Sequence, residues 1–161
     1  MSHQKELFRL PFQQFGGLLN LSKQARQEQS PESEAACDDF MYGHHTYHLD
    51  LHGRSYWHPI NYVFDQCYGL DLLRGNHRIH SDYGFDYFTP DEVKGLASDL
   101  ECLTDDDIWL GLYDHWSDDD WSDDDWSDEE RDGWVAICNA VKHFYLEAAV
   151  GGDAVITWAN Y

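Results

Sequence analysis

Three tryptophans lie inside a run of carboxylates in the stretch "DHWSDDDWSDDDWSDEERDG" at residues 114–133. The unit is Trp-Ser followed by an acidic triplet, and it recurs three times at a spacing of five residues. Aromatic faces attract cationic side chains, and carboxylates pair with them. This chemistry suits a target rich in Arg and Lys. The candidate partner-binding residues are Trp116, Asp118, Asp119, Asp120, Trp121, Asp123, Asp124, Asp125 and Trp126.

The acidity of the chain is concentrated around this repeat. The chain has 31 acidic residues against 10 Lys and Arg, which gives a formal net charge of −21. Residues 105–132 hold 14 of the acidic residues and a single basic one, Arg131, so this segment contributes −13. Such a field repels nucleic acid and anionic membranes and attracts basic proteins or cations. We therefore expect a basic protein partner, no direct nucleic-acid ligand and no membrane ligand.

A second group with chemical potential is a histidine cluster: His44, His45, His48, His52 and His58 lie within 15 residues. In a strand, His48, Asp50 and His52 project from one face, which makes them the candidate metal ligands. Residues four apart in a strand are separated by about 13 Å, so further ligands must come from elsewhere, for example His77 or His80. The alternative is a solvent-facing polar strand. On balance the sequence predicts no resident metal and no other cofactor.

Other catalytic and metal-binding patterns fail on inspection. No serine or cysteine lies in a nucleophile-elbow context, and no glycine-rich phosphate loop is present. The stretch "DEERDG" at 128–133 imitates the first half of a calcium-binding EF-hand loop, but its twelfth position is Asn139 in place of a bidentate glutamate. The sequence therefore favours a binding protein over an enzyme.

The elements that must position these residues follow from hydrophobic periodicity and breaker residues. In the stretch 44–53, Tyr47, Leu49 and Leu51 alternate with the polar side chains, as in a half-buried strand. The first half of the chain is predicted to form a strand at 7–10, a helix at 11–24, a polar mobile loop near 24–36, a strand at 44–53, a helix at 56–73 and a loop at 74–87.

The second half of the chain carries strong helix-start signals. Thr89, Pro90 and Glu92 form a capping box with proline at the first helical position, and Thr104 begins a second short helix. Each Trp-Ser-Asp-Asp-Asp unit is itself a helix-start signal, so the repeat reads as a duplicated helix start that lengthens an acidic connection. The unit with Ser127 is predicted to be the one used, for a helix that ends at Gly151. A closing strand is predicted at 153–161.

Length and composition indicate one α+β domain over residues 1–161, with several helices packed around a small, mainly antiparallel sheet and the acidic repeat at 114–132. The content of 42% hydrophobic and 16% aromatic residues provides a substantial core. No apolar stretch approaches the roughly 20 residues of a membrane span, and the N-terminal residues lack a signal-peptide pattern. We expect a cytoplasmic protein with four reduced cysteines.

Three stretches together resemble the YfbM-like family of bacterial proteins. They are "LDLHGRSYWHPINYVF" at 49–64, "YGFDYFTPDEVKGLASDLECLTDDDI" at 83–108 and "AVKHFYLEAAVGGDAVITW" at 140–158, and they cover well over a third of the chain. The resemblance implies an α+β fold and brings no catalytic residues, because the function of that family's domain is not established. The N-terminal 40 residues and the Trp-Asp repeat depart from the family pattern, so the repeat is where this chain is specialised.

We expect a non-enzymatic acidic binding protein. Its concrete form is an immunity or inhibitor protein that masks the basic, nucleic-acid-type active site of a toxin. The alternative is a small metal-dependent enzyme that uses the histidines at 44–58 and 77–80. The oligomeric state stays open.

Overall fold

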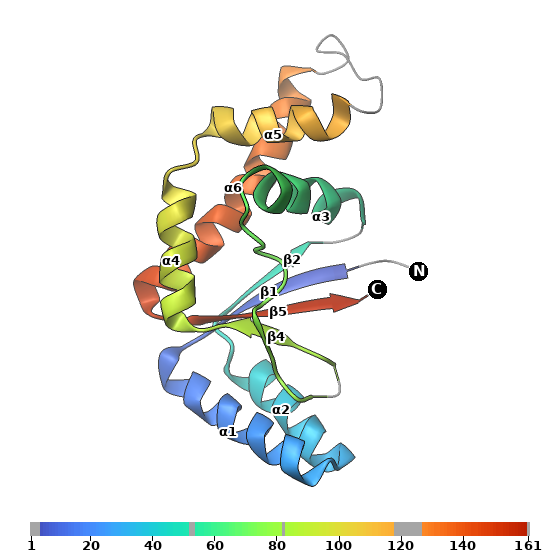
Figure 1. The fold of residues 1–161 in the computed structure, drawn as a ribbon, viewed down its shortest axis with the longest axis vertical. Coiled ribbons are helices and arrows are strands. Elements are labelled where there is room, and N and C mark those ends of the chain that lie inside the picture. The colour runs from blue at the N-terminus through green and yellow to red at the C-terminus, as the bar shows by residue number, and fades with distance from the viewer. Residues whose placement is uncertain (1–3, 52–53, 82, 118–126, 161) are drawn as a thin grey trace.

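The computed structural model describes the whole chain except residues 1–3, 52–53, 82, 118–126 and 161. A five-stranded antiparallel sheet with the strand order β2-β1-β5-β4-β3 crosses the middle of the molecule (Figure 1). The strands are β1 (Gln4–Leu10), β2 (Tyr47–Leu51), β3 (His77–Arg78), β4 (Asp86–Phe88) and β5 (Ala154–Asn160).

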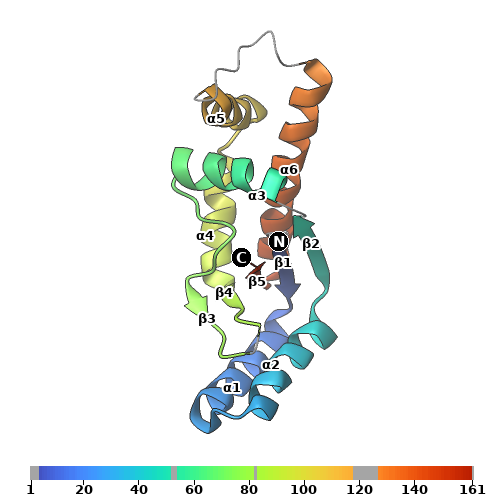
Figure 2. The same cartoon turned by 90° about the vertical axis from the view of Figure 1, so that its right-hand side faces the viewer.

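Helices cover both faces of this sheet and make three layers (Figures 1 and 2). The α+β class, with helices around an antiparallel sheet, is the one that the sequence predicted. One face carries α1 (Phe12–Glu28) and α2 (Pro31–His44). The other face carries α3 (Arg54–Asn61), a π-helical turn η1 (Tyr62–Cys67), α4 (Pro90–Glu101), α5 (Asp105–Ser117) and α6 (Asp128–Gly151). α5 and the first turns of α6 lie at the end of the molecule opposite to α1 and α2.

The alternation of side chains along the strands builds a separate core on each face of the sheet. Leu7 of β1 packs on the side of α3 to α6, whereas its neighbour Phe8 packs on the side of α1 and α2. Val155 and Ile156 of β5 divide in the same way. Because both faces are buried, β5 reads as a nearly continuous apolar run, whereas β1 is apolar only at Leu7, Phe8 and Leu10. The outer strand β2 keeps polar residues at alternate positions.

The largest difference from the sequence prediction concerns residues 24–36, which form the end of α1 and the first turns of α2 instead of a mobile loop. Gln29 ends α1 in a left-handed conformation with a φ of 52°. The Ser30 side chain then accepts a hydrogen bond from the Ser33 N–H at 3.2 Å, and Pro31 occupies the first helical position. The polar composition of this segment predicts a loop, but here the polar residues form a helix end followed at once by a capped helix start.

Three further predictions were wrong in their limits. The helix predicted at 56–73 stops at η1, because Gly69 takes a φ of 70° and turns the chain, so Leu70, Leu72 and Leu73 reach the core from an irregular segment. The predicted loop at 74–87 contains β3 and the start of β4, which pair as a short hairpin. His44 also belongs to the last turn of α2 and not to the strand.

The helix starts and the closing strand of the second half are confirmed. Thr89 and Glu92 form the predicted capping box of α4, with hydrogen bonds of 3.2 and 2.9 Å. Ser127 caps α6, and Gly152 ends it with a φ of 69°. The strand β5 then pairs with β1 and β4 in the centre of the sheet.

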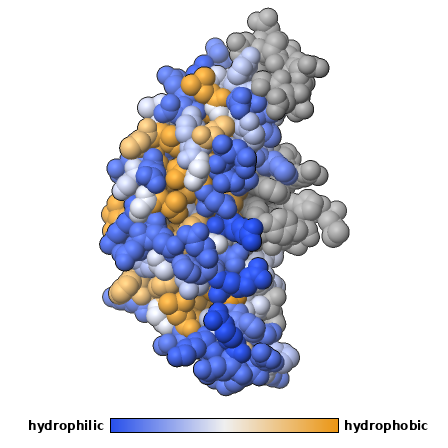
Figure 3. Space-filling model, viewed as in Figure 1, coloured by the Kyte–Doolittle hydropathy of each residue, from blue (hydrophilic) through white to orange (hydrophobic). Residues whose placement is uncertain are grey.

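Figure 3 shows a mostly hydrophilic face, with hydrophobic side chains gathered mainly in a band along its left side. Among the helices that the structure describes, none has the length and apolar character needed to cross a membrane. The four cysteines are free thiols, and Cys37 and Cys138 are buried.

Candidate functional site

The starts of α5 and α6 bring two acidic helix turns to the same end of the molecule. The Thr104 hydroxyl accepts a hydrogen bond from the Asp107 N–H at 3.2 Å, and the Asp107 carboxylate accepts one from the Thr104 N–H at 2.9 Å. Ser127 accepts from the Glu130 N–H at 3.1 Å in the same manner. First-turn carboxylates are stabilised by the positive end of the helix dipole. The fold itself therefore favours part of the acidity found here.

Half-buried tryptophans join these two helices. Trp109 and Trp116 of α5 and Trp134 of α6 all pack against the larger core. The rings of Trp116 and Trp134 meet edge to face, with centroids 4.9 Å apart. Trp116 was predicted as a partner anchor, and the structure shows that it also holds α5 against α6.

The outer side of this tryptophan layer holds a cation. The guanidinium of Arg131 lies 5.1 Å from the centroid of the Trp109 ring, and its Nη2 is 3.6 Å from Oδ1 of Asp106. An aromatic face with a carboxylate at its rim is the arrangement that the sequence suggested for an external arginine. Here the molecule binds its own arginine in that way. Sequence reasoning did not identify this pair, although Arg131 was noted as the single cation of the segment.

The outward face of α5 combines acids with one exposed leucine. Asp106, Leu110 and Asp114 lie at i, i+4 and i+8 and so share one helix face, and 61% of Leu110 is exposed. Tyr62 donates a hydrogen bond of 2.6 Å to the Asp114 carboxylate. The exposed acids that the structure describes at this end are Asp105, Asp106, Asp114, Asp128, Glu129, Glu130 and Asp132.

The negative charge affects neighbouring groups. Burial and, after it, the charge of Asp114 raise the pKa of the Cys67 thiol. Burial and the charge of Asp107 raise the pKa of Tyr68, whose hydroxyl donates to the Asp107 carbonyl at 2.6 Å. Burial is the larger cause of both shifts, and the carboxylate charges add to it.

The rest of the predicted partner-binding set lies outside the described residues. These are Asp118, Asp119, Asp120, Trp121, Asp123, Asp124, Asp125 and Trp126. What the structure provides for them is the pair of helices that the segment connects, α5 ending at Ser117 and α6 beginning at Asp128. The surface formed by α5 and residues 127–134 is hereafter called the α5–α6 acidic surface.

The predicted metal ligands are divided by the structure. His48 and Asp50 do lie together on β2, and the third member of their group is Glu6 of β1, which the sequence analysis missed. His52 lies outside the described residues. The signal that would have found Glu6 is the register of the β1–β2 pair, which places it directly opposite Asp50.

The remaining histidines do not join this group. His44 and His45 lie at the end of α2, and the exposed His58 lies on α3. His77 is on β3, at the opposite edge of the sheet from β2 and about 19 Å away at the usual strand spacing. His77 and His80 instead contact Glu92 and Glu34, each at 2.9 Å. Among the histidines that the structure describes, those at 44–58 and those at 77–80 are therefore not brought into one site, although the His45 ring lies 6.2 Å from the His48 ring.

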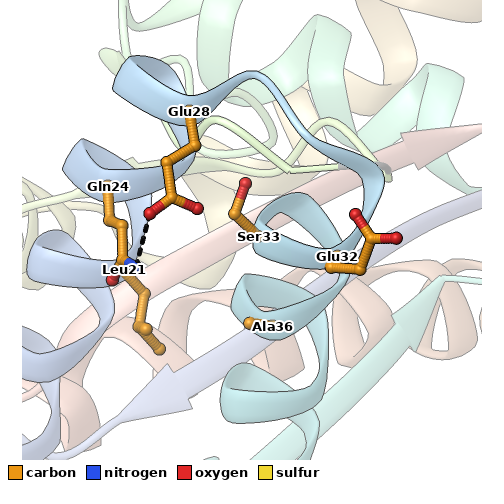
Figure 4. A pocket seen from close by; sticks show the side chains of 6 residues that line it. All are labelled: Leu21, Gln24, Glu28, Glu32, Ser33 and Ala36. Atoms are coloured by element: carbon orange, nitrogen blue, oxygen red, sulfur yellow. Dashed lines mark hydrogen bonds between the residues drawn. The ribbon is translucent and has the colours of Figure 1, made fainter.

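A shallow pocket of about 260 Å³ lies between α1 and α2 (Figure 4). Glu28 and Glu32 line it from the two helices, and Gln24 donates a hydrogen bond of 2.9 Å to Glu28. The lining residues are Leu21, Gln24, Glu28, Glu32, Ser33 and Ala36, which include no imidazole or thiol. The polar part of its lining therefore consists of two carboxylates, one amide and one hydroxyl.

Comparison with known proteins provides a fold and no activity. No model of a known protein family matches the chain, and no curated protein matches it. A structural match exists with YfbM from Escherichia coli, a protein of unknown function. The TM-score is 0.53 at 13% sequence identity, and the match covers 98% of this chain and 99% of YfbM. The chain therefore has the YfbM-like fold that the sequence resemblance predicted.

Proposed function

We propose that the protein is a cytoplasmic, non-enzymatic acidic binding module that masks a basic protein. In its concrete form it is an immunity or inhibitor protein that covers the nucleic-acid-type active site of a toxin. The observation that carries the proposal is the Arg131 site on the α5–α6 acidic surface. There a guanidinium lies against the Trp109 ring beside the Asp106 carboxylate.

An arginine of a partner that displaces Arg131 would make the same two interactions. A partner's guanidinium would find further tryptophans and carboxylates in the repeat, whose Trp116, Trp121 and Trp126 we assign as anchors. The carboxylates around them, Asp118, Asp119, Asp120, Asp123, Asp124 and Asp125, we assign as the charged rim. Aromatic anchors surrounded by a polar rim are the usual composition of a tight interface.

Charge determines which partners fit. Nucleic-acid-binding clefts are basic because they neutralise phosphates, so an acidic surface competes for the same groups. The local charge of −13 in residues 105–132 also steers a basic protein toward this end of the molecule, chiefly by raising the association rate. Leu110 adds an apolar contact between two acids on the same face of α5.

The test uses affinity capture from the source cells at low salt, followed by measurement of the purified pair. The full-length protein is the bait, and captured proteins are eluted with rising salt and identified by mass spectrometry. A captured basic protein is then produced separately, and its association rate is measured between about 50 and 300 mM salt, where surface charges pass from weak to strong screening. If it is a nuclease, inhibition of nucleic-acid cleavage is measured with the same pair.

Two matched triple variants locate the surface. Asp106→Asn, Glu129→Gln and Asp132→Asn remove three exposed charges from the α5–α6 acidic surface. The control variant removes three exposed charges from α1 and α2, with the changes Glu28→Gln, Glu32→Gln and Asp39→Asn.

Both triple variants have the same net charge. We expect a slower association, by about tenfold or more at low salt, for the first variant and a small change for the control. A third bait with Trp121→Ala and Trp126→Ala should dissociate faster. Equal rates for both triple variants would show that any binding depends on net charge alone, and the proposal would fail.

A further inference from the structure

The face of the sheet that carries α1 and α2 holds a group of two carboxylates and an imidazole at its β1–β2 side. Glu6 and Asp50 are direct partners in the antiparallel β1–β2 register, and His48 is the partner of Phe8 one pair further on. Alternation places Glu6, His48 and Asp50 on the same side as Phe8. Like charges directly opposite one another on paired strands destabilise a sheet. A cation bound between them would remove this cost.

The distances match the ligand spacing of a metal ion. Nε2 of His48 lies 3.4 Å from Oε1 of Glu6, and one ligand atom from each of the three side chains lies within 4.8 Å of the others. Donor atoms on a tetrahedral Zn²⁺ with bonds of about 2.1 Å are separated by about 3.4 Å. The His48–Glu6 pair already has this spacing, and the ligand atom of Asp50 lies within 4.8 Å of both.

The imidazole is held in place by its surroundings. The His48 ring stacks on the Phe8 ring with centroids 4.5 Å apart and an interplanar angle of 6°. Phe8 is buried in the smaller core, so its ring holds the stacked ring of His48 in a fixed plane. The side chain of His48 remains 37% exposed and that of Glu6 15% exposed. The group is thus ordered and accessible to an ion from solvent.

The electrostatic environment of this group is negative. Burial raises the pKa of the neighbouring Tyr42, and the charges of Glu6 and Asp38 raise it further. The nearest arginine along β1, Arg9, is turned to the opposite side of the strand and contacts Asp153 at 2.9 Å. Such a half-buried cluster of acids is a favourable environment for a divalent cation.

We propose that Glu6, His48 and Asp50 bind one divalent first-row transition-metal ion, with Zn²⁺ as the reference metal. One imidazole nitrogen and two carboxylate oxygens are ligands of the type that Zn²⁺, Mn²⁺ and Fe²⁺ accept. Three protein ligands leave at least one coordination position for water or another small molecule. The site lies on the side of the sheet opposite to the helices α5 and α6, so it is independent of the proposed partner binding.

The test titrates the metal-free full-length protein with Zn²⁺ by isothermal calorimetry and records the visible spectrum of the Co²⁺ complex. Glu6→Gln and Asp50→Asn remove one ligand each at nearly constant volume. The matched control is Glu34→Gln, which alters a second histidine–carboxylate pair, His80–Glu34 at 2.9 Å. Among the described residues, no third ligand atom lies close enough to complete a metal site with this pair. Thermal unfolding of each variant is followed with and without Zn²⁺.

We expect the wild type and the control to bind one equivalent of Zn²⁺ with equal affinity and to unfold at a higher temperature with the metal. Both ligand variants should bind Zn²⁺ at least about tenfold more weakly, since changes to residues that only hydrogen-bond to a metal ligand commonly lower the affinity by that much. Without metal we expect only small changes in stability, because each variant relieves the repulsion between the two carboxylates and also weakens the other interactions of the replaced group.

Three results would overturn the proposal. The first is equal Zn²⁺ affinity in the wild type and both ligand variants. The second is a loss of Zn²⁺ affinity in the Glu34→Gln control as large as in the ligand variants. The third is loss of metal-free stability in Glu6→Gln with unchanged Zn²⁺ binding. The last result would show that Glu6 acts only as an ion-pair partner of His48. Failure of this site would leave the partner-binding proposal unaffected, because the two sets of variants share no residue.

Discussion

Replacing Arg131 should have opposite effects on folding and on partner binding. In the structure its guanidinium contacts the Trp109 ring at 5.1 Å and Asp106 at 3.6 Å. The Asp106 side chain is 89% exposed, so the ion pair contributes no more than about 0.5 kcal/mol. The cation–π contact at a partly exposed site contributes about 0.5–1 kcal/mol. The Arg131→Met substitution should therefore lower the free energy of unfolding by about 1 kcal/mol.

Thermal unfolding can resolve a change of this size. For a chain of this length, 1 kcal/mol corresponds to a decrease in Tm of about 2–4 °C. Salt screens the exposed ion pair but not the ring contact, so the difference from wild type should shrink only partly at high salt. A loss above 3 kcal/mol, or none at all, would refute this account of the contact.

In a binding experiment the same substitution should have a favourable effect, on the association rate of a basic partner. Arg131→Met exposes the Trp109 face and makes residues 105–132 more negative by one charge, so a basic partner should associate faster than it does with wild type. Asp106→Asn is the matched control, because it disturbs the same ion pair but reduces the negative charge. Association that slows in Arg131→Met would show that Arg131 contacts the partner directly and does not occupy the partner's place.

Three further predictions concern stability. Thr89→Ala should cost about 1 kcal/mol, because it removes half of the capping box of α4, and urea unfolding measures this directly. Burial alone would raise the pKa of Glu92, but hydrogen bonds from Thr89 and Asn76 and the nearby His77 outweigh it and hold this pKa below its usual value. A lowered carboxyl pKa stabilises the fold at any pH above the unfolded-state pKa of about 4.3, and this stabilisation is lost as the pH falls through the folded-state pKa. Glu92→Gln should therefore show a smaller fall in stability below about pH 5 than wild type. Arg9→Met should cost about 3 kcal/mol, because it leaves the mostly buried carboxylate of Asp153 without its guanidinium, and Asp153→Asn in the same chain should recover much of the loss. Arg9→Met with wild-type stability, or the same fall in stability below about pH 5 in Glu92→Gln and wild type, would contradict the respective assignment.

Local signals predicted the second half of the chain well because each helix start there is encoded by a few adjacent residues. Thr89 with Glu92, Thr104 with Asp107, and Ser127 with Glu130 all make the expected hydrogen bonds. Ser30 and Pro31 carry the same kind of signal, and the prediction failed there because the polar residues around them were given more weight than the cap. The α+β class followed from such local patterns, whereas the YfbM-like fold followed from the resemblance of three stretches to that family.

What could not be predicted depends on pairing between distant segments. Glu6 joins His48 and Asp50 only through the β1–β2 register, which spans more than 40 residues of chain. The contact of Arg131 with Trp109 and Asp106 depends on how α5 crosses α6. Residue types and spacing identified the right classes of side chain in both places, but a single sequence contains no information about which strand lies beside which.

The duplicated helix start makes a separate prediction about tolerance to deletion. Removal of residues 121–125, the unit "WSDDD", leaves the Ser127 cap and the Trp116–Trp134 contact in place. Trp134 lies six residues beyond the start of α6, so that start is about 9 Å along the helix from a residue that touches Trp116 at the end of α5. The five residues left between the helices can span such a gap.

The deletion should therefore change the stability by little, since halving a connection alters loop-closure entropy by about 0.6 kcal/mol. It also removes three negative charges and Trp121, so a basic partner should associate more slowly and dissociate faster. Thermal unfolding and binding kinetics of the deletion variant, compared with Trp121→Ala, separate the two effects. A loss of several kcal/mol in the free energy of unfolding on deletion would mean that the second unit is part of the packed fold. The tryptophans of the repeat would then serve stability and not recognition.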